Sequence, residues 1–148
     1  MGTDNGKSVV EELSEDIQNA TLHKIKLFEE IRSSEKCHPD IPFWDIVVIG
    51  ALDPPQKEAY ELQLNEKLAR KELPSFVTYH VFNDPVGVKV GNGGGVLAVV
   101  EELEKIYGEK LNELKVLLLL SGGYSQRLPS ASLLGKVYTC LPMGKLRF

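Results

Sequence analysis

The chain has 148 residues, of which 43% are hydrophobic, and its formal net charge is −4. This length and apolar content favour one folded domain and exclude a disordered tail. Basic residues are scattered and no apolar stretch approaches the ~20 residues of a membrane helix, so we expect a cytoplasmic protein with neither a nucleic-acid nor a membrane partner.

A first helix is predicted ahead of the main domain. Residues 8–11 form a capping box that begins with Ser8, and apolar residues then recur at helical spacing as far as Ile31. Pro39 and Pro42 interrupt the pattern and mark a connector. We therefore divide the chain into an amphipathic helix with its connector, residues 1–40, and a main domain, residues 41–148.

Strands and helices are predicted to alternate along the main domain. Residues 45–51 form an apolar strand, and Asp53 and Pro54 open a helix after it. A second strand is expected at 76–82, a glycine loop at 91–95, and a helix from Val96 to Tyr107 that ends at Gly108. Residues 115–120 are the most apolar strand and are expected to be central. This order predicts an α/β fold with a mostly parallel sheet.

The segment after the last strand is the main candidate site. Ligands of parallel sheets bind where strands end, and glycines there let backbone amides approach phosphate oxygens. Gly122 and Gly123 follow the strand, and Arg127 and Lys136 add positive charges that suit a polyphosphate. The alternative is that the two glycines form an ordinary turn and the two basic side chains are solvated surface charges.

Other motifs are weaker. Val137 stands where a P-loop needs Ser or Thr, and the glycines from Gly91 lack the third glycine of a dinucleotide fingerprint. We expect His80 to be a hydrogen-bonded structural histidine, Asp84 to be a turn former rather than a metal ligand, and Trp44 to be a core anchor. Two cysteines are too few for a disulfide scaffold or a metal knuckle.

Several blocks of the chain resemble one family of sugar-phosphate nucleotidyltransferases, the L-fucose-1-phosphate guanylyltransferases or GDP-L-fucose pyrophosphorylases. The blocks are residues 43–47, 79–85, 90–94, 121–129 and 134–142. The resemblance extends over about residues 43–144 and is to the N-terminal portion of that family. It implies the N-terminal part of a nucleotidyltransferase Rossmann-like fold, in which residues 41–148 are the nucleotide-binding part of a truncated domain.

The resemblance also implies a reaction and a set of site residues. GTP and β-L-fucose-1-phosphate would form GDP-L-fucose and pyrophosphate, with Mg²⁺ bound chiefly by the nucleotide. Arg127 would hold the triphosphate and Lys136 would reach the phosphate under attack. The nucleotide would also contact Leu120, Ser121, Gly122, Gly123 and Ser125, with Gly91, Gly93 and Gly94 as a second loop over it. The other possibility for that glycine run is a flexible hinge.

Two features depart from the family. Ser125 and Gln126 stand where the wider loop has Gly and Thr. Related enzymes continue well beyond the position of Phe148, into the sugar pocket and the metal-binding carboxylate. We therefore expect a catalytically incomplete fragment of the enzyme; the alternative is a non-enzymatic nucleotide-binding or interaction fragment whose exposed sheet edge pairs with another chain.

Overall fold

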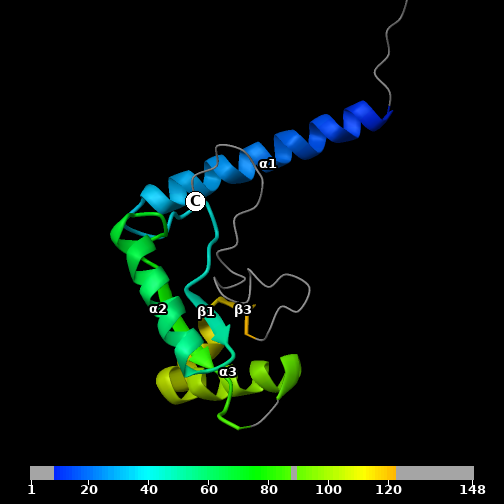
Figure 1. Cartoon of the computed structure of the whole chain (residues 1–148). Helices are drawn as coiled ribbons and strands as arrows, with labels where there is room; N and C mark the ends of the chain where they lie inside the picture. Colours follow the sequence, from blue (N-terminus) through cyan, green and yellow to red (C-terminus); the bar gives the residue numbers. More distant parts are fainter. Residues whose placement is uncertain (1–8, 88–89, 123–148) are drawn as a thin grey trace, which may run out of the picture.

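The computed structural model describes residues 9–87 and 90–122 (Figure 1). The elements in chain order are α1 (Val9–Ser33), β1 (Ile46–Ala51), α2 (Pro54–Ala69), β2 (Thr78–Asn83), α3 (Gly91–Tyr107), a 3-10 helix (Gly108–Glu113) and β3 (Val116–Leu120). The alternation of strand and helix after α1 confirms the predicted α/β fold. None of the described helices is long and apolar enough to cross a membrane.

The three described strands form a parallel sheet in the order β2-β1-β3. Ile46 of β1 is level with Thr78 of β2 on one side and with Val116 of β3 on the other. All six residues of β1 are buried, as expected for a strand with a neighbour on each side and a helix on each face.

The expectation that residues 115–120 form the central strand is wrong for the described part of the sheet. Strand β3 pairs there with β1 alone, and its residues are half-buried or exposed. The apolar content of a strand indicates how much of its two faces is buried. The order of strands in the sheet depends instead on the direction in which each connection crosses the sheet. Both β1 and β3 are apolar enough to be the central strand. The chain connections between the strands place β1 in the middle.

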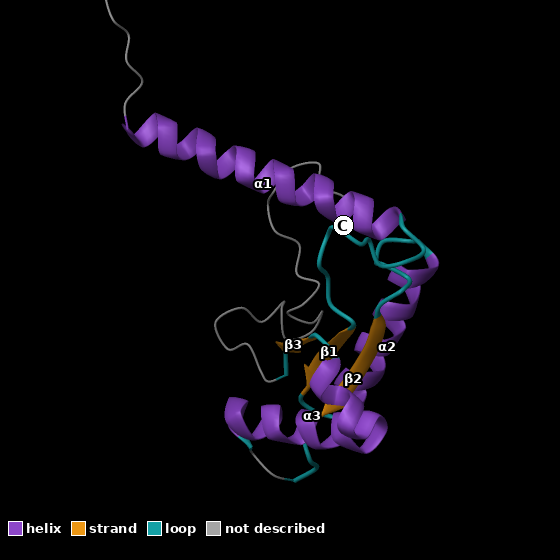
Figure 2. Cartoon of the chain, turned by 180° about the vertical axis from the view of Figure 1, so that it is seen from behind, coloured by secondary structure: helices purple, strands orange, loops and turns teal. Residues whose placement is uncertain are grey.

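The helices cover opposite faces of the sheet (Figure 2). Ile49 and Ala51 pack with Tyr60 and Leu64 of α2, whereas Ile46 and Val48 pack with Val99 and Leu103 of α3. Alternate residues of a strand point to opposite faces, so β1 contributes to both layers. The crossovers from β1 to β2 and from β2 to β3 run in opposite directions along the sheet, and right-handed connections in opposite directions place their helices on opposite faces.

The boundaries of α2 and α3 were predicted with different success. Asp53 is the N-cap of α2, and its Oδ1 accepts a hydrogen bond from the Gln56 amide at 2.9 Å, as the sequence predicted. Helix α3 begins at Gly91, five residues before the predicted start, so the glycine run forms its first turn and the expectation of a loop is wrong. The helix ends before Gly108 as predicted, and Gly108 itself has a φ of 56°.

Helix α1 contacts the domain through its last turns. The Phe28 and Phe43 rings are 6.5 Å apart and the Phe43 and Phe76 rings are 6.2 Å apart. Ile31 is buried, and the Arg32 guanidinium donates to the Lys71 carbonyl at 2.8 Å. The earlier turns of α1 extend away from the sheet (Figures 1 and 2). Ser8, the predicted cap, lies outside the described residues.

Trp44 departs from its predicted role as a core anchor. Its side chain is 39% exposed, while the neighbouring Phe43 makes the ring contacts that connect α1 to the domain. Successive residues of an extended segment point to opposite sides, so only one of two adjacent aromatic side chains reaches the interior.

Candidate functional site

The carboxyl ends of the three strands meet at one edge of the sheet, where ligands of parallel α/β sheets bind. Two connections converge there on the end of β1. The Asp84 amide after β2 donates to the Ala51 carbonyl at 3.0 Å, and the Ser121 amide after β3 donates to the Gly50 carbonyl at 3.1 Å. The chain segments that directly follow β2 and β3 therefore meet at the end of β1.

Ser121 is held in place by hydrogen bonds at this edge. It is buried, its hydroxyl donates to the Gly50 carbonyl at 3.0 Å, and its own carbonyl accepts from the Tyr60 hydroxyl at 3.3 Å. The side chain therefore positions the segment after β3, and its hydroxyl proton is already directed to the protein backbone. Leu120 just before it is 43% exposed and leaves an apolar surface beside this segment.

Gly122 lies against the backbone at the end of β1. A Cβ atom at this position would be 2.9 Å from the Ala51 carbonyl carbon and 2.9 Å from the Leu52 amide nitrogen. The Leu52 amide is itself occupied, since it donates to the Gln56 side-chain oxygen at 2.7 Å. A side chain therefore has no room here, and the glycine is required for the close approach of two backbone segments.

Replacing Gly122 with alanine should lower the free energy of unfolding by about 1–3 kcal/mol, because the new methyl group meets backbone that cannot move aside easily. Urea denaturation would measure the change. Gly93→Ala is the matched control: its Cβ would meet nothing within 4 Å, so its stability should stay equal or rise slightly. Equal stability of Gly122→Ala and the native chain would contradict the close approach.

The glycine run occupies the first turn of α3. Gly91 has a φ of 63°, and a Cβ on Gly94 would lie 2.6 Å from Cβ of Val90, so both positions need glycine for structural reasons. Gly93 has no such constraint in the described structure. The N-cap residue Val90 offers no side-chain hydrogen bond to the first-turn amides. These amides carry the positive end of the helix dipole, which favours an anion.

Asp84 is the acidic side chain next to this turn. Its Oδ1 lies 3.2 Å from the position that a Cβ on Gly95 would occupy, and burial raises the pKa of its carboxyl. Its carbonyl accepts a hydrogen bond from the side-chain Nδ2 of Asn83 at 2.8 Å, and a turn follows at Val86 and Gly87. Within residues 9–87 and 90–122, no group of three His, Cys, Asp or Glu side chains is placed to hold a metal ion.

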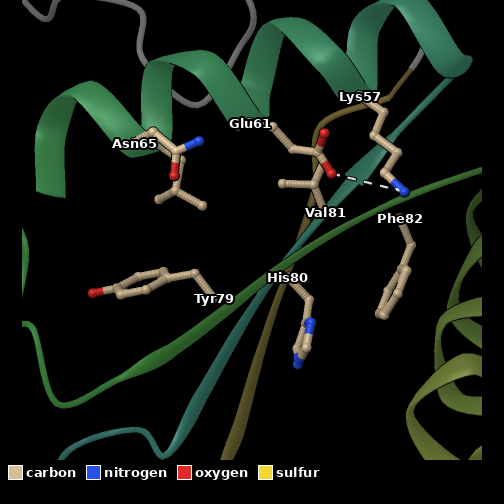
Figure 3. Close-up of a pocket in the computed structure, with 8 residues that line it drawn as sticks. Lys57, Glu61, Asn65, Tyr79, His80, Val81 and Phe82 are labelled. Carbon is tan, nitrogen blue, oxygen red and sulfur yellow. Dashed lines mark ion pairs between the residues drawn. The ribbon is translucent and has the colours of Figure 1, made fainter. Parts of the chain in front are cut away.

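His80 has the structural surroundings that the sequence predicted. Its Nε2 lies 2.8 Å from the Tyr107 hydroxyl, its ring stacks on Phe82 at 5.5 Å, and burial lowers its pKa. It also borders a pocket of about 350 Å³ between β2 and α2 (Figure 3), lined by Lys57, Glu61, Leu64, Asn65, Tyr79, His80, Val81 and Phe82. This pocket contains none of the predicted nucleotide-binding residues, and we place the candidate site at the carboxyl edge.

The structure adds two positioning residues that the sequence reading missed. Gln56 bridges the end of β1 and the start of α2, and Tyr60 reaches the Ser121 carbonyl. In the sequence Tyr60 reads as one more apolar-face residue of its helix, but a buried tyrosine hydroxyl usually finds a hydrogen-bond partner. Among the predicted site residues, Gly123, Ser125, Arg127 and Lys136 lie outside the described residues.

Curated proteins similar to the chain share one activity in their names. The chain is 53% identical to fucose-1-phosphate guanylyltransferase of Mus musculus over 129 residues, and 53% identical to that of Homo sapiens over 128 residues. These matches include 87% and 86% of the chain but 22% and 21% of the relatives. A bifunctional fucokinase/GDP-fucose pyrophosphorylase of Arabidopsis thaliana is 30% identical over 138 residues, which are 79% of the chain and 13% of that relative.

The chain thus spans about a fifth of the length of the curated mouse and human relatives it matches. A family model described as the fucose pyrophosphorylase domain matches residues 108–146. That range includes β3, Ser121 and Gly122, and in sequence it continues through Arg127 and Lys136. No solved structure matches the chain with significance.

Proposed function

We propose that this chain, which is related to the fucose-1-phosphate guanylyltransferases, forms the GTP-binding edge of an enzyme that makes GDP-L-fucose. The substrates would be GTP and β-L-fucose-1-phosphate, and the products GDP-L-fucose and pyrophosphate. The observation that carries the proposal is the backbone contact at Gly122, which places a segment without side-chain bulk at the carboxyl edge of the sheet. A cytoplasmic location belongs to the same proposal.

The chemistry needs charge stabilisation more than it needs a protein nucleophile. A phosphate oxygen of the sugar phosphate attacks the α-phosphorus of GTP, and the bond from that phosphorus to the bridging oxygen of pyrophosphate breaks. Negative charge grows on the leaving pyrophosphate, so fixed positive groups lower the barrier. Arg127 would hold the triphosphate with a bidentate guanidinium, and Lys136 would contact the α-phosphate as a compact charge.

The described residues support the nucleotide in two ways. The backbone from Leu120 to Gly122 would lie against ribose and guanine, with the exposed Leu120 side chain as an apolar contact. The first turn of α3, with Gly91, Gly93 and Gly94, would direct its amides toward phosphate oxygens. The segment after β3 is bonded to the end of β1, and Gly95 in the first turns of α3 lies beside Asp84, whose amide is bonded to the same strand end; the proposal is that one ligand reaches both segments.

Mg²⁺ would be held chiefly by the triphosphate, the usual arrangement for this ion, and would neutralise phosphate charge when bound.

The chain of residues 1–148 should bind GTP weakly in the presence of Mg²⁺, and ATP less well, since the segment after β3 would contact the base through its backbone. Isothermal titration calorimetry with each nucleotide would measure both affinities. Gly122→Ala should weaken GTP binding, whereas Leu62→Ala, at an exposed position on α2, should not. Equal affinity for GTP and ATP would overturn the guanine assignment, and no binding of either would overturn the site.

A further inference from the structure

The first turns of α1 present an apolar stripe that the described domain leaves uncovered. Leu13 is 57% exposed and Ile17 is 68% exposed. The same face continues through Ala20, the charged Lys24, Leu27 and Ile31, at alternating spacings of four and three residues counted from Leu13, so the stripe is apolar except at Lys24. This spacing is the heptad pattern of a helix that packs along another helix.

The stripe is already buried at one end. Ile31 packs against the domain, and Phe28 and Arg32 fix the same end of α1 through Phe43 and Lys71. Toward the N-terminus α1 extends past the described domain (Figures 1 and 2). A second helix could therefore cover the stripe from its first turns to about Leu27 without displacing the domain.

The charges along α1 indicate which helix would fit. Residues 11–16 include four acidic residues and no Lys or Arg, whereas residues 23–26 include Lys24, Lys26 and His23. An antiparallel copy of the same helix would bring the acidic turns of one chain beside the basic turns of the other. A parallel copy would place like charges together, which opposes pairing.

We propose that residues 10–27 of α1 pair with the same residues of a second copy of this chain in an antiparallel two-helix contact. In the register that aligns the two stripes, Ile17 faces Ala20 of the other copy and Leu13 faces Lys24. The aliphatic stem of Lys24 would then cover Leu13 while its ammonium group reaches the opposing Asp16. This contact does not depend on the nucleotide site, which lies at the carboxyl edge of the sheet.

The paired segment would be short, roughly 27 Å at ~1.5 Å per residue, so we expect a dimer of micromolar affinity. Sedimentation equilibrium of residues 1–148 over a wide concentration range would measure it. Ile17→Asp should raise the dissociation constant at least about tenfold, because it puts a charge into two symmetrical layers. Leu22→Asp is the matched control: Leu22 is 56% exposed on the opposite face of the same helix, and its replacement should leave the constant unchanged.

A charge exchange tests the antiparallel arrangement itself. Asp16→Lys alone and Lys24→Asp alone should each weaken the dimer, and the two together should restore it, because each new charge then faces its opposite. Circular dichroism would confirm that every variant keeps its helical content. A native chain that remains monomeric, or association that Ile17→Asp leaves unchanged, would overturn the proposal; the second result would point to a contact through another surface of the chain. Failure of the exchange to restore pairing would overturn the antiparallel register.

Discussion

Replacing Arg127 with alanine should lower turnover by about a hundredfold or more, since removal of one preorganised donor to a developing charge costs about 2.7–4 kcal/mol. Because the chain matches 22% of the mouse relative, the test uses a protein of that relative's full length. A chimera in which this chain replaces the matching part of the mouse relative, with which it is 53% identical, would supply one. The KM for fucose-1-phosphate should change much less than kcat, because the proposed partner of the guanidinium is the triphosphate and not the sugar phosphate.

The control for this substitution is Arg70→Ala. Arg70 caps the far end of α2, where it pairs with Glu66, and so lies away from the carboxyl edge that Asp53 marks at the other end of that helix. Its removal should leave turnover of the chimera unchanged. If the kcat of the Arg127→Ala chimera stayed within a few fold of that of the parent chimera, Arg127 would be a surface charge. The catalytic assignment would then be wrong.

Replacing Tyr60 with alanine should lower the free energy of unfolding by about 3–5 kcal/mol, the usual cost of truncating a large buried ring. Tyr60 is 1% exposed and packs with Ile49, Ala51 and Val81 beneath the carboxyl edge. Its hydroxyl also donates to the Ser121 carbonyl, so the cavity would open directly under the segment after β3. Urea denaturation followed by circular dichroism would measure the loss.

Tyr60→Phe separates the two contributions of this side chain. It keeps the ring and removes the hydroxyl, so the expected loss is only about 0.5–1.5 kcal/mol, while GTP binding should weaken because Ser121 loses a partner. Leu62→Ala, on an exposed position of the same helix, should change neither quantity appreciably. A Tyr60→Phe chain with unaltered GTP affinity would show that this hydrogen bond does not position the nucleotide site.

Much of the fold was predictable because its signals are local. The apolar run before Asp53, the Asp53 cap and Gly108 after α3 each act within a few residues, and the structure confirms all three. The start of α3 was missed because a run of glycines disfavours a helix by intrinsic propensity. In the structure, however, Val90 lies close to Gly94, and Gly95 is buried beside Asp84. Tertiary packing therefore requires small residues in this turn and offsets their low helix propensity.

The site was predictable in its place along the chain but not in its contacts. Glycines after an apolar strand indicated residues 120–123, and the structure puts Ser121 and Gly122 at the carboxyl edge of the sheet. Nothing local could show that the Ser121 hydroxyl is directed to Gly50, since those residues are 71 positions apart. The contributions of Arg127 and Lys136 remain predictions.

The residues read in order were enough to predict the alternation of strands and helices, the N-cap of α2 and the similarity to the fucose-1-phosphate guanylyltransferases, because propensity, capping and sequence identity are all properties of the linear chain. The position of β1, rather than β3, in the middle of the described sheet and the close approach of Gly122 to Ala51 are visible only in the folded chain. Strand order and close approach depend on how crossovers run through space, and segments distant in sequence meet only after the helices have packed on opposite faces of the sheet.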